Sequence, residues 1–222
     1  MDISPTKESI EFYFDPISPF AWLASTQLEM IRQETGADIV VKPILFAGLL
    51  KAHGNVGPAE IPAKRSYTFR DVLRQAKNLG LQAECPPQHP FNPLLGLRIC
   101  TAIEDNAIRL RFGCALMKAA WADGLDITLE KTIGGIADSC DLDLDFVISL
   151  AQDQAVKQKL VAATHSAVEL GVFGVPTFRL NDQIFWGEDR IAELIRYANG
   201  QRIDEEKLSE ILSRTAATQR KK

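Results

Sequence analysis

The sequence has few cysteines, and their spacing excludes the two common uses of paired cysteines. Cys85, Cys100, Cys114 and Cys140 have neither the spacing of a zinc site nor the Cys-x-x-Cys spacing of a redox pair. The N-terminal residues also lack the basic segment and apolar core of a signal peptide, so we expect a cytoplasmic protein with reduced thiols. Cys100 and Cys114 fall within helical patterns, which indicates positions in the core.

Long apolar runs, a strong net charge and the common nucleotide and hydrolase motifs are absent as well. No apolar run approaches the length of a membrane span, and the formal charge of −4 gives no reason to expect a nucleic acid partner. There is no Gly-x-Ser-x-Gly elbow, phosphate-binding loop or dinucleotide fingerprint. His53, His89 and His165 are far apart and have no acidic partner at ligand spacing, so we expect no metal site.

What the sequence does contain is an ordinary globular composition and enough length for a large core. Apolar residues make up 46% and charged residues 24% of its 222 residues, as in typical soluble proteins. A chain of this length forms either one large domain or a domain that carries an insertion.

Residues 12–23 carry a strand that turns sharply into a helix. Apolar and more polar side chains alternate over residues 10–14, which is the period of a strand with one buried face. Apolar side chains then recur at helical spacing over residues 20–31. Between the two patterns, Asp15 and Pro16 supply the turn.

Ser18 precedes the expected first helical residue, Pro19, and has two interpretations. A serine there can accept a hydrogen bond from an orphan backbone amide, and a proline at the first helical position loses no usable donor. These residues alone therefore favour a helix cap. The functional alternative is that a hydroxyl beside free amides and the positive end of the helix dipole stabilises an anion such as a thiolate.

A second segment, residues 173–178, favours the functional interpretation of the serine. Gly174 and Val175 form a turn pair, and Pro176 then leads into a strand-like run over residues 177–180. A proline so placed is confined to an edge, a bulge or the start of a strand, and a cis peptide bond is open to it.

These two segments together resemble the thioredoxin-like superfamily, in which a strand–turn–helix unit carries the reactive centre opposite a Val–cis-Pro loop. The fuller match is to one branch, 2-hydroxychromene-2-carboxylate isomerase and the related kappa-class glutathione transferase. Residues 18–21 stand in the place of Cys-x-x-Cys and hold no cysteine, so disulfide exchange through the protein is not available. The motifs that carry the resemblance are Phe12–Asp15, Ser18–Leu23, His53–Ala59, Phe173–Thr177 and Phe185–Arg190.

The resemblance implies an α/β protein with a thioredoxin-like fold interrupted by a helical insertion domain, as in DsbA and kappa-class glutathione transferases. We assign residues 1–45 and 166–222 to the thioredoxin-like domain and residues 46–165 to the helical insertion domain. We expect the insertion to pack over the edge of the sheet that carries Ser18.

Strand and helix signals agree with this division. Strand patterns occur at residues 38–44 and in a hairpin, residues 177–186, whose turn is Asn181-Asp182; the residues between these two regions show helical spacing. The proline-rich residues 86–93 cannot form a regular element. A helix is expected from Pro62, and its buried face should consist of Phe69, Val72, Leu73 and Ala76. We expect disorder at residues 1–9 and 214–222.

The resemblance also implies glutathione as the cofactor, with Ser18 as the catalytic residue and a cis Val175–Pro176 bond. The loop 186–189 would hold the glutamyl end of glutathione, with backbone amides on its carboxylate and Asp189 on its ammonium group. Acidic residues in a first helical turn are also favoured by the helix dipole alone. The implied cofactor-binding residues are Ser18, Asn55, Val175, Pro176, Trp186, Gly187, Glu188 and Asp189.

Some residues near these motifs keep an alternative interpretation. Asn55 is either a turn residue or, as the resemblance implies, a polar group that reaches glutathione. Lys64 and Arg65 are usual surface residues, although an acidic substrate needs a cation nearby. Trp22 and Trp186 are expected in the core or in the wall of a binding site.

A serine hydroxyl without an adjacent base is a poor nucleophile, but it is a good hydrogen-bond donor. A bond donated to the glutathione sulfur would favour the thiolate over the thiol, whose ordinary pKa is about 8.5. The resemblance implies that the thiolate adds to a conjugated double bond and leaves after rotation, which interconverts 2-hydroxychromene-2-carboxylate and trans-o-hydroxybenzylidenepyruvate in aromatic catabolism. We therefore expect a small aromatic or conjugated acid as substrate. The resemblance also leads us to expect a homodimer.

Two other functions fit the same residues. A kappa-like glutathione transferase would use the same serine and thiolate but release a conjugate. Ala21 stands where relatives often have a second serine or a similar polar residue. The third hypothesis is therefore a glutathione-binding or peptide-binding protein without turnover.

Overall fold

Strand β1 (Ser9–Phe14) is an inner strand of the sheet in a computed structural model that describes residues 8–214. It pairs in parallel with β2 (Asp38–Pro43) and antiparallel with β3 (Thr177–Leu180). β4 (Gln183–Trp186) pairs antiparallel with β3, which gives the strand order β2-β1-β3-β4. The sheet is therefore mixed, and its last two strands form the predicted hairpin.

Local chemistry explains the hairpin turn and the burial of the inner strand β1. Asn181, in the hairpin turn, has a φ of 54°, in the left-handed region that asparagine adopts more readily than most residues. The first strand is almost wholly enclosed, because Ile10, Phe12 and Phe14 are each 0% exposed. Ser9 belongs to β1 and not to the disordered lead expected at residues 1–9, whose first seven residues lie outside the described ones.

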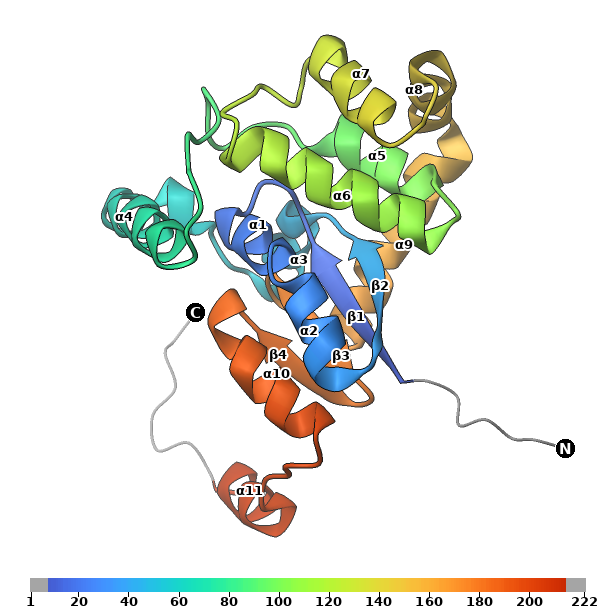
Figure 1. The fold of residues 1–222 in the computed structure, drawn as a ribbon. Helices are drawn as coiled ribbons and strands as arrows, with labels where there is room; N and C mark the ends of the chain where they lie inside the picture. The colour runs from blue at the N-terminus through green and yellow to red at the C-terminus, as the bar shows by residue number, and fades with distance from the viewer. Residues whose placement is uncertain (1–7, 215–222) are drawn as a thin grey trace, which may run out of the picture.

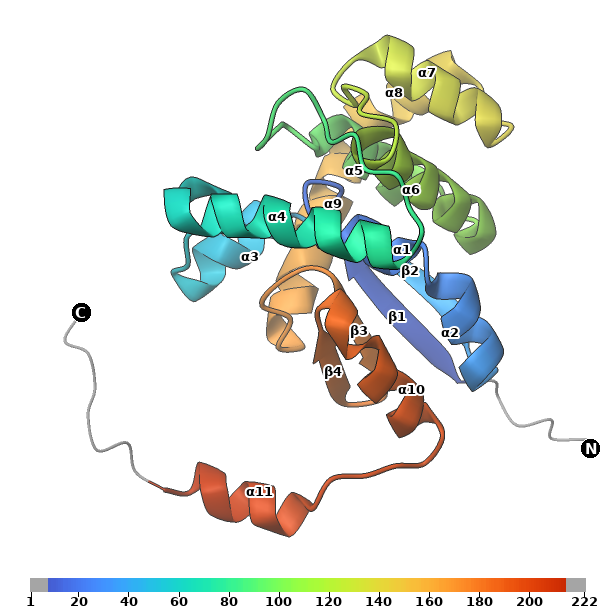
Figure 2. The same cartoon turned by 60° about the vertical axis from the view of Figure 1, so that its left-hand side comes forward.

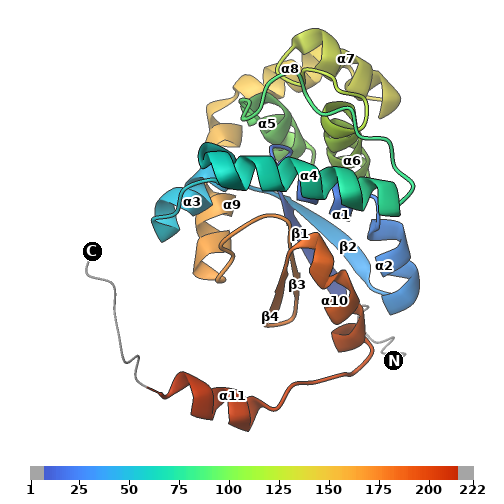
Figure 3. The same cartoon turned by 90° about the vertical axis from the view of Figure 1, so that its left-hand side faces the viewer.

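Helices cover both faces of the sheet and one of its ends (Figure 1). Viewed in Figure 3, α3 and α9 lie on one side of the strands and α2 and α10 on the other. The helices are α1 (Pro19–Ser25), α2 (Leu28–Thr35), α3 (Phe46–His53), α4 (Pro62–Asn78), α5 (Leu94–Ala102), α6 (Asn106–Trp121), α7 (Glu130–Ser139), α8 (Leu144–Gln152), α9 (Gln154–Glu169), α10 (Ile191–Ala198) and α11 (Glu205–Leu212), with short 3-10 turns η1 (Pro58–Glu60) and η2 (Glu188–Arg190).

Every element described between β2 and β3 is helical, as the sequence predicts. The proline-rich residues 86–93 form an irregular connection between α4 and α5, also as predicted. Helices α5 to α8 gather above the end of β1 (Figure 1), and both α4 and α6 contact α1. The division into domains at residues 45/46 and 165/166 stays a prediction.

The sheet shares one hydrophobic core with the helical segment, by which we mean the chain between β2 and β3 with helices α3 to α9. Phe12 on β1 and Trp22 on α1 belong to the same buried cluster as Phe112 and Trp121 of α6. Cys100 and Cys114 also lie in or against this cluster, as predicted, and burial raises the pKa of the Cys114 thiol to about 11. All four cysteines are free thiols.

The helix expected over residues 20–31 is broken in two. α1 ends at Ser25, and α2 begins three residues later, at Leu28. The Ser25 hydroxyl donates to the Trp22 carbonyl at 2.7 Å, and the Thr26 hydroxyl donates to the Leu23 carbonyl at 2.8 Å. These side chains compete with the backbone for helical carbonyls, which a pattern of apolar spacing does not reveal.

The buried face of α4 is narrower than predicted. Val72 and Ala76 are buried and Phe69 is half-buried, but Leu73 is 51% exposed. Leu73 follows Val72 by one residue and is therefore rotated about 100° around the helix, away from the side that α1 covers.

Helix α11 lies apart from the rest of the molecule (Figure 2). None of its side chains is buried, and Leu208, Ile211 and Leu212 are exposed. The predicted basic tail starts just beyond it, and residues 215–222 of that tail lie outside the described residues. No helix within residues 8–214 has the length and apolar character needed to cross a membrane.

Candidate active site

Ser18 lies between β1 and α1, and its side chain caps the helix as predicted. Its Oγ accepts a 3.3 Å hydrogen bond from the Ala21 amide, and Pro19 occupies the first helical position. The φ and ψ angles of Ser18, −91° and 117°, are the extended values typical of an N-cap. Ser18 is 8% exposed, so its surroundings enclose it without sealing it off from the surface.

The same hydroxyl faces the proline loop. Ser18 Oγ donates a 3.3 Å hydrogen bond to the carbonyl oxygen of Val175, which is 157 residues away in the sequence. The Val175–Pro176 peptide bond is cis, as predicted. The fold thus brings Ser18, Val175 and Pro176 together, with the serine proton directed from the helix toward the loop.

Asp15 is expected from the sequence only as a turn residue, but its carboxylate is 1% exposed. Its Oδ1 accepts a 3.0 Å hydrogen bond from the Ile17 amide, and its Oδ2 accepts a 2.9 Å bond from the Phe46 amide. Burial raises the pKa of Asp15 to about 7, although both backbone bonds favour the ionised form. A titrating carboxyl therefore lies three residues before Ser18.

Two ring N–H groups from the helical segment hold the carbonyls of the same turn. Trp121 Nε1 on α6 donates a 2.8 Å hydrogen bond to the Pro16 carbonyl. His89 Nε2, on the proline-rich connection, donates to the Ile17 carbonyl at 3.0 Å. Because a carbonyl oxygen only accepts, Nε2 carries a proton, and burial lowers the pKa of the His89 ring.

The loop after β4 is tied to the proline loop through its backbone. The Gly187 amide donates a 2.9 Å hydrogen bond to the Pro176 carbonyl. Gly187 has a φ of 108°, which side chains rarely allow, and a Cβ there would overlap the Asp189 carboxylate. The predicted loop 186–189 is therefore adjacent to the predicted Val175–Pro176 site.

Glu188 in this loop is an acidic side chain with only 9% exposure. Its Oε1 is buried and has no hydrogen-bond partner within residues 8–214. Burial raises the pKa of Glu188, the nearby carboxylates of Asp189 and Asp71 raise it further, and a bond from Gln27 opposes them. An incompletely paired carboxyl beside two others is chemically suited to receive a cation.

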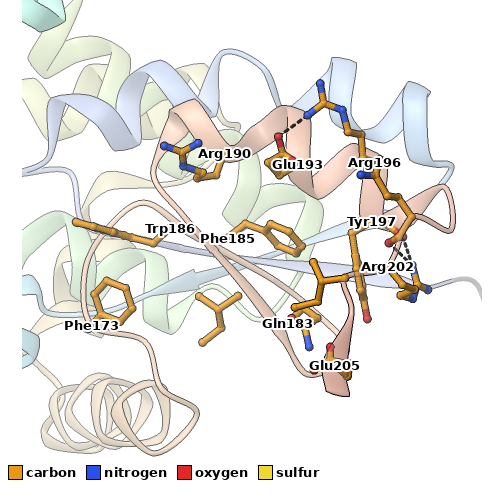
Figure 4. A pocket seen from close by; sticks show the side chains of 13 residues that line it. Phe173, Gln183, Phe185, Trp186, Arg190, Glu193, Arg196, Tyr197, Arg202 and Glu205 are labelled. Atoms are coloured by element: carbon orange, nitrogen blue, oxygen red, sulfur yellow. Dashed lines mark hydrogen bonds and ion pairs between the residues drawn. The ribbon is translucent and has the colours of Figure 1, made fainter. Parts of the chain in front are cut away.

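Trp186 forms an exposed wall, since it is 52% exposed, whereas Trp22 is buried in the core at 1%. Gly174 lies so close to the Trp186 indole that an added Cβ would overlap its Nε1. The Phe173 ring packs edge-on against the same indole at 4.9 Å. Both rings line a cavity of about 480 Å³ between β4, α10 and the connection to α11, and Ser18 is not among its lining residues. Figure 4 shows the two rings in the wall of this cavity.

The structure does not connect every predicted residue to Ser18. Asn55 is exposed, and in the described part of the chain its side chain makes no hydrogen bond to the Ser18 turn or the Val175 loop. Lys64 and Arg65 are exposed on α4, and the Arg65 guanidinium lies over the Phe69 ring at 5.1 Å. Ala21 is fully buried at 0% exposure, so its departure from the family pattern falls inside the core.

Four residues of this region are missed by sequence reasoning: Asp15, Asp71, His89 and Trp121. The only local signal is an aspartate and proline after an aromatic strand, which indicates a turn and says nothing about burial. The other three come from distant helices or connections and act through contacts that spacing does not encode. Within residues 8–214 no group of three or more His, Cys, Asp and Glu side chains is arranged to hold a metal ion.

A helix-capping serine opposite a cis-proline loop, on a four-stranded mixed sheet, defines a thioredoxin-fold protein without the redox cysteines. A family model described as a DSBA-like thioredoxin domain matches residues 9–198, so the chain belongs to that family. Its relatives place it, within the family, in the branch of 2-hydroxychromene-2-carboxylate isomerase, to which kappa-class glutathione transferases are related.

The similarity covers most of each protein. A 2-hydroxychromene-2-carboxylate isomerase of Sphingobium xenophagum is 32% identical over 196 residues, which are 86% of this chain and 97% of that protein. Human glutathione S-transferase kappa 1 is 24% identical, over 90% of this chain and 94% of the transferase. A solved structure of selenomethionine 2-hydroxychromene-2-carboxylate isomerase superposes with a TM-score of 0.80 at 27% identity, over 93% of this chain and 100% of that one. These relatives support an enzyme of isomerase or transferase type.

Proposed function

We propose that the protein is a glutathione-dependent isomerase of the 2-hydroxychromene-2-carboxylate type, acting in aromatic-compound catabolism. The observation that carries the proposal is the Ser18 hydroxyl, which caps α1 and donates its proton toward the Val175 loop at 3.3 Å. A donor in this place can turn to a sulfur atom without any change of the backbone. The names of the isomerase relatives support the reaction type.

The residues at the far end of the proposed site fit the glutamyl part of glutathione. Glu188 Oε1 is buried without a hydrogen-bond partner in the described chain, and the Asp189 and Asp71 carboxylates lie nearby. An ammonium group is a cation with several donors, and it would pair the orphaned oxygen and lower the pKa of Glu188. We assign Glu188 and Asp189 to this ammonium group, with Trp186 and Gly187 as the adjoining wall and backbone.

Bound glutathione would supply a thiol whose thiolate form adds to a conjugated double bond and leaves again after rotation about the resulting single bond. The Ser18 hydroxyl would donate a hydrogen bond to the sulfur and keep its proton, which stabilises negative charge on the sulfur and lowers the pKa of the thiol. The N-terminal end of α1 adds a positive partial charge on the same side. Val175 and Pro176 would present backbone to the cysteinyl part of glutathione, as in strand addition.

The substrate is proposed to be a small aromatic or conjugated acid. Phe173 and Trp186 expose aromatic surface next to the Val175–Pro176 loop. Lys64 and Arg65 on α4 are the cations that we propose for its carboxylate, and Asn55 is proposed as a polar contact on the same side. We also propose a cytoplasmic homodimer; free thiols support the location, and sedimentation equilibrium would measure the association.

Incubation of the protein with glutathione and 2-hydroxychromene-2-carboxylate tests the reaction. We expect the trans-o-hydroxybenzylidenepyruvate isomer to accumulate while the total glutathione stays constant, because the thiol is regenerated in each cycle. A glutathione conjugate in place of the isomer would support the transferase function that the kappa-class relatives suggest. If neither the isomer nor the conjugate forms although calorimetry detects glutathione binding, the protein is a non-catalytic glutathione-binding protein.

A further inference from the structure

We propose that Asp15 is a positioning residue that holds the Ser18 turn against the start of helix α3. The inference rests on the function proposed above, since the turn carries the hydroxyl assigned to the glutathione sulfur. Asp15 ends the motif Phe12–Asp15, but the sequence assigns it only to a turn, and the assigned site does not include it.

All three oxygens of Asp15 are engaged, and two of them shape the Ser18 turn. The Asp15 carbonyl accepts a 3.0 Å hydrogen bond from the Ser18 amide, and Oδ1 accepts the Ile17 amide at 3.0 Å. The second bond closes an Asx turn, which fixes the orientation of the peptide groups that lead to Ser18. The direction of the Ser18 backbone therefore depends on where the Asp15 side chain is held.

The remaining oxygen of Asp15 holds that side chain on another element. Oδ2 accepts the amide of Phe46, the first residue of α3, at 2.9 Å. The N-cap residue of α3 is Leu45, whose side chain cannot cap a helix, so Asp15 supplies the missing acceptor from 31 positions away. A carboxylate at this end of α3 is also favoured by the helix dipole.

Protonation would weaken this double link. A neutral carboxyl group keeps one good acceptor oxygen and turns the other into an O–H donor, which faces a backbone N–H. With its pKa raised to about 7 by burial, Asp15 changes between these states near neutral pH. Its carboxylate faces the Ile17 and Phe46 amides, and no charged side chain contributes to its shift. The other titratable side chain in contact with the turn is that of His89, which donates a hydrogen bond to the Ile17 carbonyl.

The first experiment uses the unmodified protein without glutathione. Backbone amide resonances of Ile17, Ser18 and Phe46 should titrate together, with a common midpoint near pH 7. In Asp15→Asn this common titration should disappear, whereas a signal that arises from His89 would persist. Independent midpoints for Ile17 and Phe46 in the unmodified protein would overturn the proposed link.

The second experiment measures the thiolate absorbance of the protein–glutathione complex against pH. Asp15→Asn replaces one acceptor by an NH₂ group, so we expect the Ser18 donor to be displaced and the thiol midpoint to rise by about half a pH unit or more. A purely electrostatic role predicts the opposite shift, because removal of a negative charge favours the thiolate. A lowered or unchanged midpoint would overturn the proposal.

Thr164→Val is the matched control. Thr164 is buried, and its hydroxyl accepts the Leu45 amide at 3.0 Å, so the variant also loses a hydrogen bond at the start of α3. The Thr164 side chain does not contact the Ser18 turn. For Thr164→Val we therefore expect a lower melting temperature and an unchanged midpoint of the glutathione thiol titration. In a Ser18→Ala background, Asp15→Asn should cause no further shift. If glutathione does not bind at all, the proposed function fails, and the amide titration still decides the Asp15 link.

Discussion

At the scale of single residues, the Ser18 turn is held by one donor of its own and by two donors from distant parts of the chain. Its successive carbonyls at Asp15, Pro16 and Ile17 accept bonds from Ser18, Trp121 and His89 in turn. A buried polar group left without its partner costs about 1–3 kcal/mol, so each of these bonds restricts the turn. The Ser18 turn is therefore held by its surroundings as much as by its own sequence.

Replacement of Ser18 by alanine separates capping from thiolate stabilisation. Loss of the cap should lower the free energy of unfolding by about 0.5–2 kcal/mol. If the hydroxyl also holds the thiolate, the variant should raise the pKa of bound glutathione and slow isomerisation at pH 7. Part of that loss should be recovered as the pH rises, because hydroxide then removes the proton unaided.

The measurement is the thiolate absorbance of the glutathione complex against pH, for the native protein and Ser18→Ala. Titrations that superimpose would leave Ser18 as a cap alone. The free energy of unfolding, measured by urea denaturation, reports the cap independently.

At the scale of elements, the two C-terminal helices have opposite roles. α10 packs against α2 and the hairpin, and its Leu194 is fully buried at 0% exposure. α11 has no buried side chain, and its Ile211 is 47% exposed. Isolated helices of this length are marginal in water, so α11 contributes little to the stability of the body.

Truncation of one apolar side chain in each helix tests this difference. Leu194→Ala should lower the free energy of unfolding by about 2–5 kcal/mol, since it opens a cavity in the core. Ile211→Ala is the matched control and should change it by less than about 0.5 kcal/mol. Urea denaturation of both variants gives the comparison, and a large loss in Ile211→Ala would show that α11 is packed in solution.

At the scale of the whole molecule, the sheet and the helical segment between β2 and β3 are joined at the Ser18 turn. Trp121 on α6 belongs to the shared core and also bonds the Pro16 carbonyl next to Ser18. Gly113 on the same helix lies against the Phe14 ring, where an added Cβ would come within 3.0 Å of Cζ. These contacts bind the two parts into one unit.

We therefore expect the molecule to unfold in a single transition. In urea, circular dichroism and tryptophan fluorescence should give coincident curves. Trp121→Phe removes the bond to Pro16 and should shift both curves together, by about 1–3 kcal/mol. Separate midpoints for the two probes would mean that the helical segment unfolds on its own.

Sequence patterns over a few neighbouring residues predicted the local features of this structure. The strand–turn–helix unit, the Ser18 cap, the hairpin at Asn181 and the irregular proline-rich connection follow from patterns within a few positions. The cis bond at Pro176 follows from the family resemblance. The break between α1 and α2 and the exposure of Leu73 could not be read, because they depend on side-chain bonds and on which side of a helix is covered.

The sequence by itself determined most of the elements, the family and the position of the serine, because propensity and motifs act over short distances; it did not predict the break between α1 and α2 or helix α11. Only the tertiary structure decided what surrounds that serine. The Asp15 bond to Phe46 spans 31 positions, and the Trp121 bond to Pro16 spans 105. Burial, and with it the raised pKa of Asp15, arises when distant segments exclude water together, and no stretch of the sequence carries that information alone.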